Sequence, residues 1–159
     1  MHITIVCTGS IKERYLAEGI AEYEKRLRPF ARVEFREIRE ERMPERPSPA
    51  QRAQAIQREG LRLLELVPKK SHLFALDLHG REISSEELAA SLSALALEGR
   101  SDLTFLIGGA FGISEEVRQA ARERLCLSRL TFTHQIARLL LMEQLYRAFK
   151  INRGEPYHW

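Results

Sequence analysis

Two cationic side chains in the last apolar stretch have the types and the spacing for chemistry. His134 and Arg138 stand four positions apart in the run THQIARLLL, so a helix would place them on one face. A neutral imidazole can accept a proton near neutral pH, and a guanidinium can stabilise a developing negative charge. The same spacing also suits a purely structural hydrogen-bonded pair, so both interpretations stay open at this point.

A glycine-rich segment upstream offers a place for a ligand. The run LTFLIGGAFG, residues 103–112, contains Gly108, Gly109 and Gly112, which let the backbone approach a ligand closely. It matches neither of the common phosphate-binding glycine motifs, so a plain tight turn is the alternative. Segments 76–80 and 127–132 also follow apolar runs. If these runs form neighbouring strands, all three segments open at one sheet edge, where open α/β sheets bind ligands.

The C-terminal segment mixes aromatic and cationic side chains. Lys150 and Arg153 precede Tyr157, His158 and Trp159, the single tryptophan of the chain. Rings that stack on bases, together with cations that contact phosphates, are typical of proteins that hold unpaired RNA. The alternative is an ordinary frayed terminus. The composition of the segment favours RNA contact.

Alternating strand and helix patterns surround these residues. Apolar runs predict strands, and apolar residues three or four positions apart predict amphipathic helices. The predicted strands cover residues 2–9, 31–38, 73–80, 102–108 and 125–127, and the predicted helices cover 14–27, 51–67, 84–97, 114–124 and 133–149. This order predicts one α/β domain over residues 1–159, with a mainly parallel sheet and helices on both faces.

Polar side chains mark the ends of several elements. Ser84 and Glu87 have the spacing of a capping box, and Ser114 is an N-cap candidate before two glutamates. Gly99 suits a helix C-terminus. Asp77, at the end of the third predicted strand, could bond a ribose hydroxyl or cap the next turn.

Composition and charge exclude several classes of protein. The 25 Lys and Arg residues against 22 Asp and Glu residues give a net charge of +3, so RNA binding needs a local basic patch. The sequence has no apolar run of the roughly 18 residues that span a membrane and no signal-peptide pattern. Cys7 and Cys126 lie in apolar runs without ligand-like neighbours, which predicts structural thiols and no metal site. We expect a cytoplasmic protein that does not bind a membrane.

Two further stretches bear on partners. Residues 39–51 carry three prolines and dense mixed charge, which predicts an exposed loop that is either a solvated connector or a mobile arm. The last predicted helix is apolar around most of its circumference, which indicates burial on several sides. In a small domain this predicts a homodimer. Glu143 and Arg147 have the spacing of an ion pair within that helix.

Four segments together resemble a known family. The runs LDLHG, LIGGAFG, LSRLTFTHQIARLLLMEQLYRAFKI and RGEPYH are similar to the ribosomal RNA large subunit methyltransferase H family, of the SPOUT class. The resemblance covers the whole chain and is most specific over residues 134–158. It implies a trefoil knot within about residues 71–159 and S-adenosyl-L-methionine as methyl donor. It also implies methylation of N3 of a pseudouridine in 23S rRNA, on the assembled ribosome.

The resemblance and the residue types together assign roles. The expected methyl-donor contacts are Leu76, Gly108, Gly109, Leu127, Ser128, Arg129, Leu130, Thr131 and Phe132. The expected catalytic residues are His134, Arg138, Tyr157 and His158, and the expected RNA contacts are Lys150, Arg153 and Trp159. The general base is His134 or His158. The family commonly has proline where Thr133 stands, and Thr133 can cap the following helix, so we expect a small local change.

Two other functions fit parts of the sequence. A nucleotide-binding oxidoreductase would use the glycines and Asp77, but Gly9 stands almost alone where the dinucleotide fingerprint belongs. A non-catalytic ribosome-binding factor would use the arm and the tail without chemistry.

Overall fold

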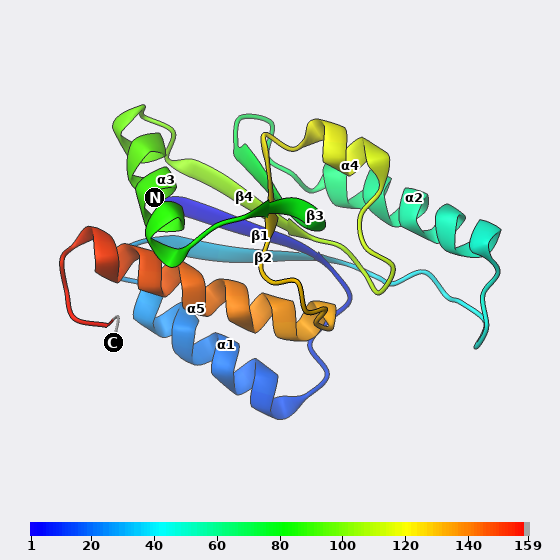
Figure 1. Ribbon diagram of the computed structural model, residues 1–159. Coiled ribbons are helices and arrows are strands. Elements are labelled where there is room, and N and C mark those ends of the chain that lie inside the picture. Colours follow the sequence, from blue (N-terminus) through cyan, green and yellow to red (C-terminus); the bar gives the residue numbers. More distant parts are fainter. Residues whose placement is uncertain (158–159) are drawn as a thin grey trace.

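The computed structural model describes residues 1–157 as five strands and five helices in alternation. Figure 1 follows the chain from blue to red. The strands are β1 (His2–Thr8), β2 (Arg32–Ile38), β3 (His72–Glu82), β4 (Asp102–Ile107) and β5 (Glu123–Cys126). The helices are α1 (Arg14–Leu27), α2 (Pro49–Glu65), α3 (Ser85–Leu97), α4 (Glu115–Ala120) and α5 (His134–Asn152).

All five strands belong to one parallel sheet, in the order β2-β1-β4-β3-β5. The predicted parallel sheet is therefore confirmed. Strands β4, β3 and β5 are neighbours, as the prediction of a shared sheet edge for the three segments required. Segments 108–113 and 127–132 follow β4 and β5 at the carboxyl edge of the sheet, and residues 76–80 form an irregular part of β3 next to the end of β4.

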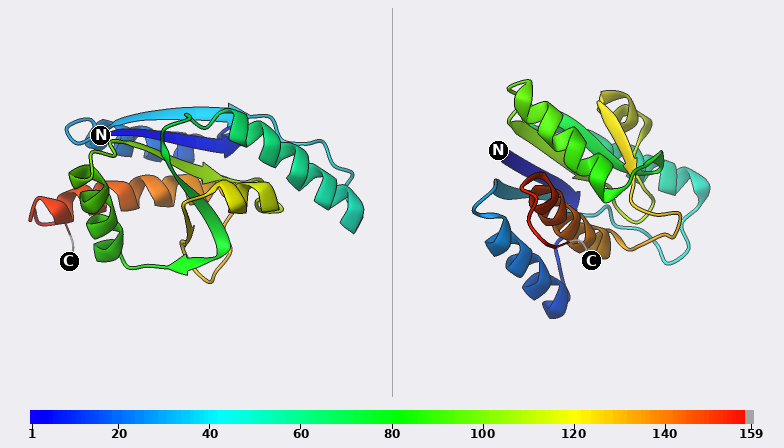
Figure 2. Two further views of the ribbon diagram at one scale, coloured as in Figure 1. Left: turned by 90° about the horizontal axis from the view of Figure 1, so that it is seen from above. Right: turned by 60° about the vertical axis from the view of Figure 1, so that its left-hand side comes forward.

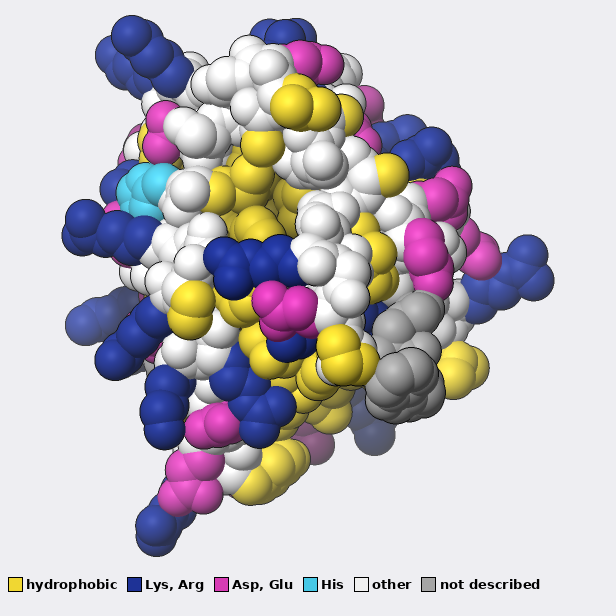
Figure 3. All heavy atoms as spheres, turned by 90° about the vertical axis from the view of Figure 1, so that its left-hand side faces the viewer, with side chains coloured by type: hydrophobic (Ala, Val, Ile, Leu, Met, Phe, Trp, Pro, Cys, Tyr) yellow, Lys and Arg dark blue, Asp and Glu magenta, His cyan; other side chains and the backbone are white. Residues whose placement is uncertain are grey.

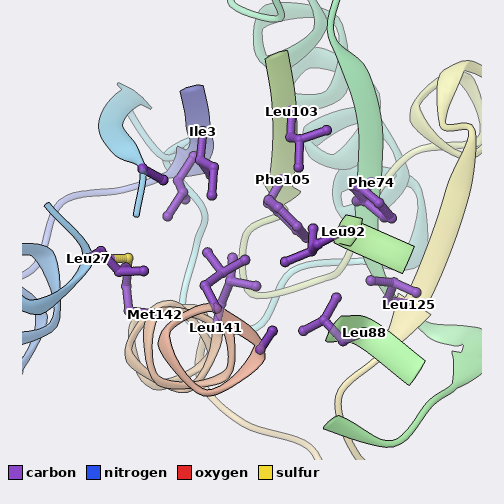
Figure 4. Close-up of a cluster of buried hydrophobic side chains, with 14 of the residues drawn as sticks. Ile3, Leu27, Phe74, Leu88, Leu92, Leu103, Phe105, Leu125, Leu141 and Met142 are labelled. Carbon is purple, nitrogen blue, oxygen red and sulfur yellow. The ribbon is translucent and has the colours of Figure 1, made fainter. Parts of the chain in front are cut away.

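The helices cover both faces of the sheet, as predicted (Figures 1 and 2). Helices α1, α3 and α5 pack on one face around Phe74, Phe105 and Leu141, and Figure 4 shows these side chains converging. Helices α2 and α4 cover the other face around Leu63 and Leu106. Each buried Leu or Phe stabilises the fold by about 1.5–3 kcal/mol, so both layers are anchored by apolar burial.

The predicted caps of three helices are confirmed. Ser84 and Glu87 form a capping box at α3, Ser114 caps α4, and the Thr133 side chain accepts from Ile136 N at the start of α5. At the other end of α3, Gly99 takes a positive φ of 73°. The sequence did not reveal the capping box of Ser48 and Gln51, which starts α2 at Pro49 rather than at residue 51.

The prediction of a helix over residues 114–124 is wrong in its second half. Helix α4 ends at Ala120, and β5 begins at Glu123 and pairs with β3. Arg122 N donates to Leu73 O at 2.9 Å, and Leu125 is buried. Sheet pairing and burial therefore override the helical preference of this segment.

Strand β3 continues beyond its predicted end through an irregularity. Leu76 and Arg81 both pair with Leu125, so the register shifts and the residues between them leave the regular ladder. Gly80 lies against the neighbouring backbone, because an added Cβ would lie 2.7 Å from Arg124 O. A glycine is therefore required at this crossing.

Within residues 1–157, no helix is long and apolar enough to cross a membrane. The domain boundaries and the trefoil knot stay predictions.

Candidate functional site

The three segments predicted to bind a ligand line one pocket of about 270 Å³. The first contributes Leu76 to His79, the second Gly108 to Ile113, and the third Leu127, Ser128, Leu130, Thr131 and Phe132. His134 and Ala137, from the first turn of α5, complete one wall. The pocket therefore joins parts of the chain that are far apart in the sequence at the carboxyl edge of the sheet.

Backbone packing explains the glycines of the second segment. A Cβ on Gly108 would collide with Gly112 O and lie 2.7 Å from Ile113 Cγ2. A Cβ on Gly109 would lie 2.6 Å from the Glu59 carboxylate of α2. Gly112 has a φ of 91°, which L side chains rarely adopt. The segment is thus a tight turn that also lines the pocket. The two interpretations of the glycines, a tight turn and a ligand segment, are therefore compatible.

Asp77 is held by cations rather than left free for a ligand. Its side chain accepts from His79 N at 3.2 Å, from Arg118 Nε at 3.0 Å and from Arg124 at 3.3 Å. Burial alone would raise the pKa of Asp77, but these hydrogen bonds and the two positive charges outweigh burial and lower it. The interpretation of Asp77 as a cap is supported, and its oxygens are engaged where an oxidoreductase would need them for ribose.

The third segment presents backbone and apolar groups to the pocket. Ser128 Oγ accepts from Leu130 N at 3.0 Å, and Cys126 Sγ donates to Ser128 O at 3.1 Å. Leu130 is 72% exposed, and Phe132 is also exposed. Arg129 does not line the pocket; its exposed side chain pairs with Glu82 at 3.0 Å.

His134 lies where the pocket meets α5. Its Nε2 lies 3.0 Å from Glu40 Oε1, on the segment between β2 and α2. Burial lowers the pKa of His134; Arg138 and Lys12 lower it further, and Glu40 opposes them. The imidazole is therefore neutral near pH 7 and able to accept a proton.

Arg138 is almost fully buried, at 1% exposure, and does not line the pocket. It donates to Gly9 O at 2.7 Å, to Thr8 O at 3.3 Å and to Glu37 Oε1 at 2.5 Å. These contacts tie α5 to the carboxyl end of β1. The structure places Arg138 one helical turn from His134, so its charge acts on the imidazole without direct contact.

The tail residues lie at the opposite end of α5. Tyr157 packs on Tyr146 with ring centroids 4.8 Å apart, and the Arg147 guanidinium lies 4.9 Å from the Tyr157 ring. Lys150 pairs with Glu155, and Arg153 stacks over Phe30. Figure 3 views this end of the molecule, where apolar side chains line a hollow among charged ones. His158 and Trp159 lie outside the described residues.

Within residues 1–157 of one chain, the structure does not bring Tyr157 to the pocket. Helix α5 has 19 residues, which at 1.5 Å per residue span about 28 Å. His134 begins this helix, and Tyr157 packs on Tyr146, which lies 12 residues further along α5, or about 18 Å along the axis. Within residues 1–157 of one chain, Tyr157 and the pocket are therefore separate.

Comparison with known proteins identifies the family. Residues 1–158 match the family described as "Predicted SPOUT methyltransferase". The chain is a SPOUT methyltransferase. Ribosomal RNA large subunit methyltransferase H of Carboxydothermus hydrogenoformans is 52% identical to it over 158 residues, which is 99% of each chain. The protein of the same name from Bacillus thuringiensis is 48% identical over the same shares.

Solved structures show a weaker similarity. The crystal structure of TrmJ from Z. mobilis ZM4 matches 99% of this SPOUT methyltransferase and 71% of its own chain, at 14% identity and a TM-score of 0.44.

Several pocket residues of this SPOUT methyltransferase were not predicted from its sequence. Ala110, Phe111 and Ile113 do lie within the predicted segment 108–113, although the sequence assigned them no separate role. Arg118 lines the pocket from α4, and Glu40 contacts His134 from outside the pocket; no local signal marks either residue.

No group of three or more His, Cys, Asp or Glu residues within residues 1–157 could hold a metal ion. Cys7 and Cys126 are free and buried, in agreement with the prediction of structural thiols.

Proposed function

We propose that this SPOUT methyltransferase uses S-adenosyl-L-methionine to methylate N3 of a pseudouridine in 23S rRNA. The observation that carries the proposal is the convergence of three backbone-rich segments on one pocket, with a neutral imidazole in its wall. The name of its relatives, ribosomal RNA large subunit methyltransferase H, supports an rRNA substrate. An rRNA substrate in turn implies a cytoplasmic location.

The pocket residues fit the proposed methyl donor. The glycine turn admits no side chain at Gly108, so the backbone itself forms that part of the wall. Backbone carbonyls and apolar groups such as Leu76 and Leu127 suit an adenosyl group and a cationic sulfonium better than further arginines would. When bound, the donor supplies an electrophilic methyl group. The contribution of the chain is to hold it in line with the attacking nitrogen.

A proton must leave the nucleophile. N3 of pseudouridine lies between two carbonyl groups and carries an imide proton, so it is a poor nucleophile until the ring becomes anionic. His134 is neutral, lines the pocket and is a candidate to take this proton, while His158 is the other candidate. Arg138, one turn along α5, would stabilise the developing negative charge through its field.

The tail would act from a second chain. We propose a homodimer in which Tyr157 and Trp159 of one subunit position the base at the pocket of the other, with Lys150 and Arg153 near RNA phosphates. Within one chain α1 and α3 already cover much of α5, so the remaining apolar surface is smaller than its sequence suggests. Ile136 and Leu140 on α5 are only half-buried, and Leu130 and Phe132 on the segment before α5 are exposed. These side chains offer an apolar face to a partner.

Methyl transfer to ribosomes tests the function. Tritiated S-adenosyl-L-methionine and ribosomes that lack the modification should give label at N3 of a 23S pseudouridine with the wild-type chain. Binding to ribosomes without label would favour a non-catalytic ribosome-binding factor.

Mixed dimers test the shared site. Gly108→Arg removes the pocket and Tyr157→Ala removes the tail ring, so each variant alone should be inactive. A mixture after subunit exchange should regain activity, because one of the two sites then combines an intact pocket with an intact tail. If the subunits exchange and the mixture still shows no methyl transfer, the shared site is contradicted.

A further inference from the structure

We propose that Glu40 is a positioning residue that holds the His134 imidazole in the orientation needed for proton removal. The proposal rests on the proposed function, in which His134 acts at the pocket. Glu40 lies on the segment between β2 and α2, whereas His134 begins α5, and Glu40 does not line the pocket. Its carboxylate oxygen Oε1 lies 3.0 Å from His134 Nε2.

The imidazole nitrogen has no better partner. His134 Nε2 is fully buried and makes no well-aligned hydrogen bond to any residue that the structure describes. Glu40 Oε1 is at ion-pair distance, so a small rotation of either side chain completes the bond. A proton on Nε2 that points to Glu40 leaves the lone pair on Nδ1, which fixes the tautomer of a base. Carboxylates orient catalytic imidazoles in this way in unrelated enzymes.

The end of β1 is shaped to admit this pair. An added Cβ on Gly9 would collide with Glu40 Oε1 and lie 3.1 Å from His134 Nε2. Both side-chain tips therefore occupy the space that any other residue at position 9 would fill. Gly9 also has a φ of 74°, and its carbonyl accepts from Arg138. The same glycine thus makes room for the pair and anchors the helix that carries His134.

The backbone at Glu40 is held in place by contacts of the next residue, Glu41. Glu41 N donates to Glu59 Oε1 at 2.8 Å, and the Glu41 carboxylate pairs with Arg62 at 2.7 Å. Both partners belong to α2. The start of the segment 39–51, predicted as a connector or a mobile arm, is therefore bound to α2. This fixes the backbone position from which the Glu40 side chain contacts His134.

Charges from every side set the protonation of the imidazole. Lys12 from the β1–α1 connection and Arg138 from α5 disfavour the imidazolium, as burial does, and Glu40 favours it. Removing the Glu40 charge should therefore lower the pKa of His134 further. A weaker and misoriented base is the expected consequence.

The test compares Glu40→Gln with Glu45→Gln in the full chain. Glu45 is an exposed carboxylate of the same segment, so it controls for net charge. We expect Glu40→Gln to lower kcat on ribosomes about tenfold or more, with the KM for ribosomes and the Kd for S-adenosyl-L-methionine within twofold of wild type. The acid limb of kcat should move to lower pH, and Glu40→Asp should recover part of kcat. Glu45→Gln should behave as wild type.

An NMR titration separates this proposal from the proposed function. The His134 imidazole, assigned by comparison with His134→Gln, should titrate at lower pH in Glu40→Gln than in wild type, whether or not the chain methylates ribosomes. An unchanged His134 pKa in Glu40→Gln would overturn the pairing. Wild-type kcat in Glu40→Gln, or an equal loss in Glu45→Gln, would overturn the positioning role. Absence of methyl transfer by the wild type, with the pKa shift present, would instead contradict the proposed function alone.

Discussion

The two ends of α5 use similar residue types under opposite conditions. At the start of the helix, His134 and Arg138 are enclosed by the ends of β1 and β2, and Arg138 is bonded to fixed carbonyls. At the far end, Arg147 and Arg153 lie over aromatic rings at a charged surface. Enclosure strengthens electrostatic effects and fixes geometry, whereas cation–π contacts at an exposed surface are weaker and can be exchanged for contacts with a partner. The first end suits chemistry, and the second suits RNA contact.

The largest effect should come from filling the pocket at the enclosed end. Gly108→Arg adds a side chain where even a Cβ collides, so we expect the affinity for S-adenosyl-L-methionine to fall at least about 1,000-fold, or roughly 4 kcal/mol. Calorimetry measures it. Gly99→Ala is the control for loss of a glycine, since an added Cβ on Gly99 has no neighbour within 4 Å. Unchanged affinity in Gly108→Arg would remove the donor from this pocket.

A second comparison replaces one arginine at each end. Arg138→Met leaves the carbonyls of Thr8 and Gly9 without their buried donor and Glu37 without its partner, which should cost about 3 kcal/mol of unfolding free energy. Arg147→Met breaks a partly exposed pair with Glu143 and should cost about 1 kcal/mol. Urea denaturation gives both values. Equal losses would show that the two ends do not differ in enclosure.

Arg138→Met should also separate binding from chemistry. Because Arg138 does not line the pocket, the affinity for S-adenosyl-L-methionine of folded Arg138→Met should stay near wild type while ribosome methylation is lost. Lost donor affinity in the folded variant would move Arg138 into the donor site.

The smallest expected effect is a pH dependence of stability at the enclosed end. Burial lowers the pKa of His134, so between this pKa and about 6.5 the unfolded chain binds more protons than the folded one. Folding free energy from His134 is therefore fully present above about pH 6.5 and declines as the pH falls through that window. The difference between wild type and His134→Gln isolates this contribution from Glu59, whose pKa is raised by burial. A difference that grows as the pH falls would refute the lowered pKa.

The sequence predicted what local patterns encode. The apolar runs and glycines placed three segments at one sheet edge, and Ser84, Ser114 and Thr133 marked three helix starts correctly. It missed the break at Ala120, because only pairing with β3 makes the following residues a strand. It also missed Glu40, whose partner lies far along the chain. Contacts between distant residues leave no periodic signal, so they needed the structure.

The bonds from Arg138 to Thr8 and Glu37 also bear on the order of folding. They join residues 130 and 101 positions apart, so the enclosed end closes only when the first strand meets the last helix. Contacts of such long sequence separation form slowly, because chain entropy is lost before they stabilise anything. During synthesis β1 emerges long before its last partner exists. We therefore expect catalytic competence to appear after most of the secondary structure, so that activity reports completed folding.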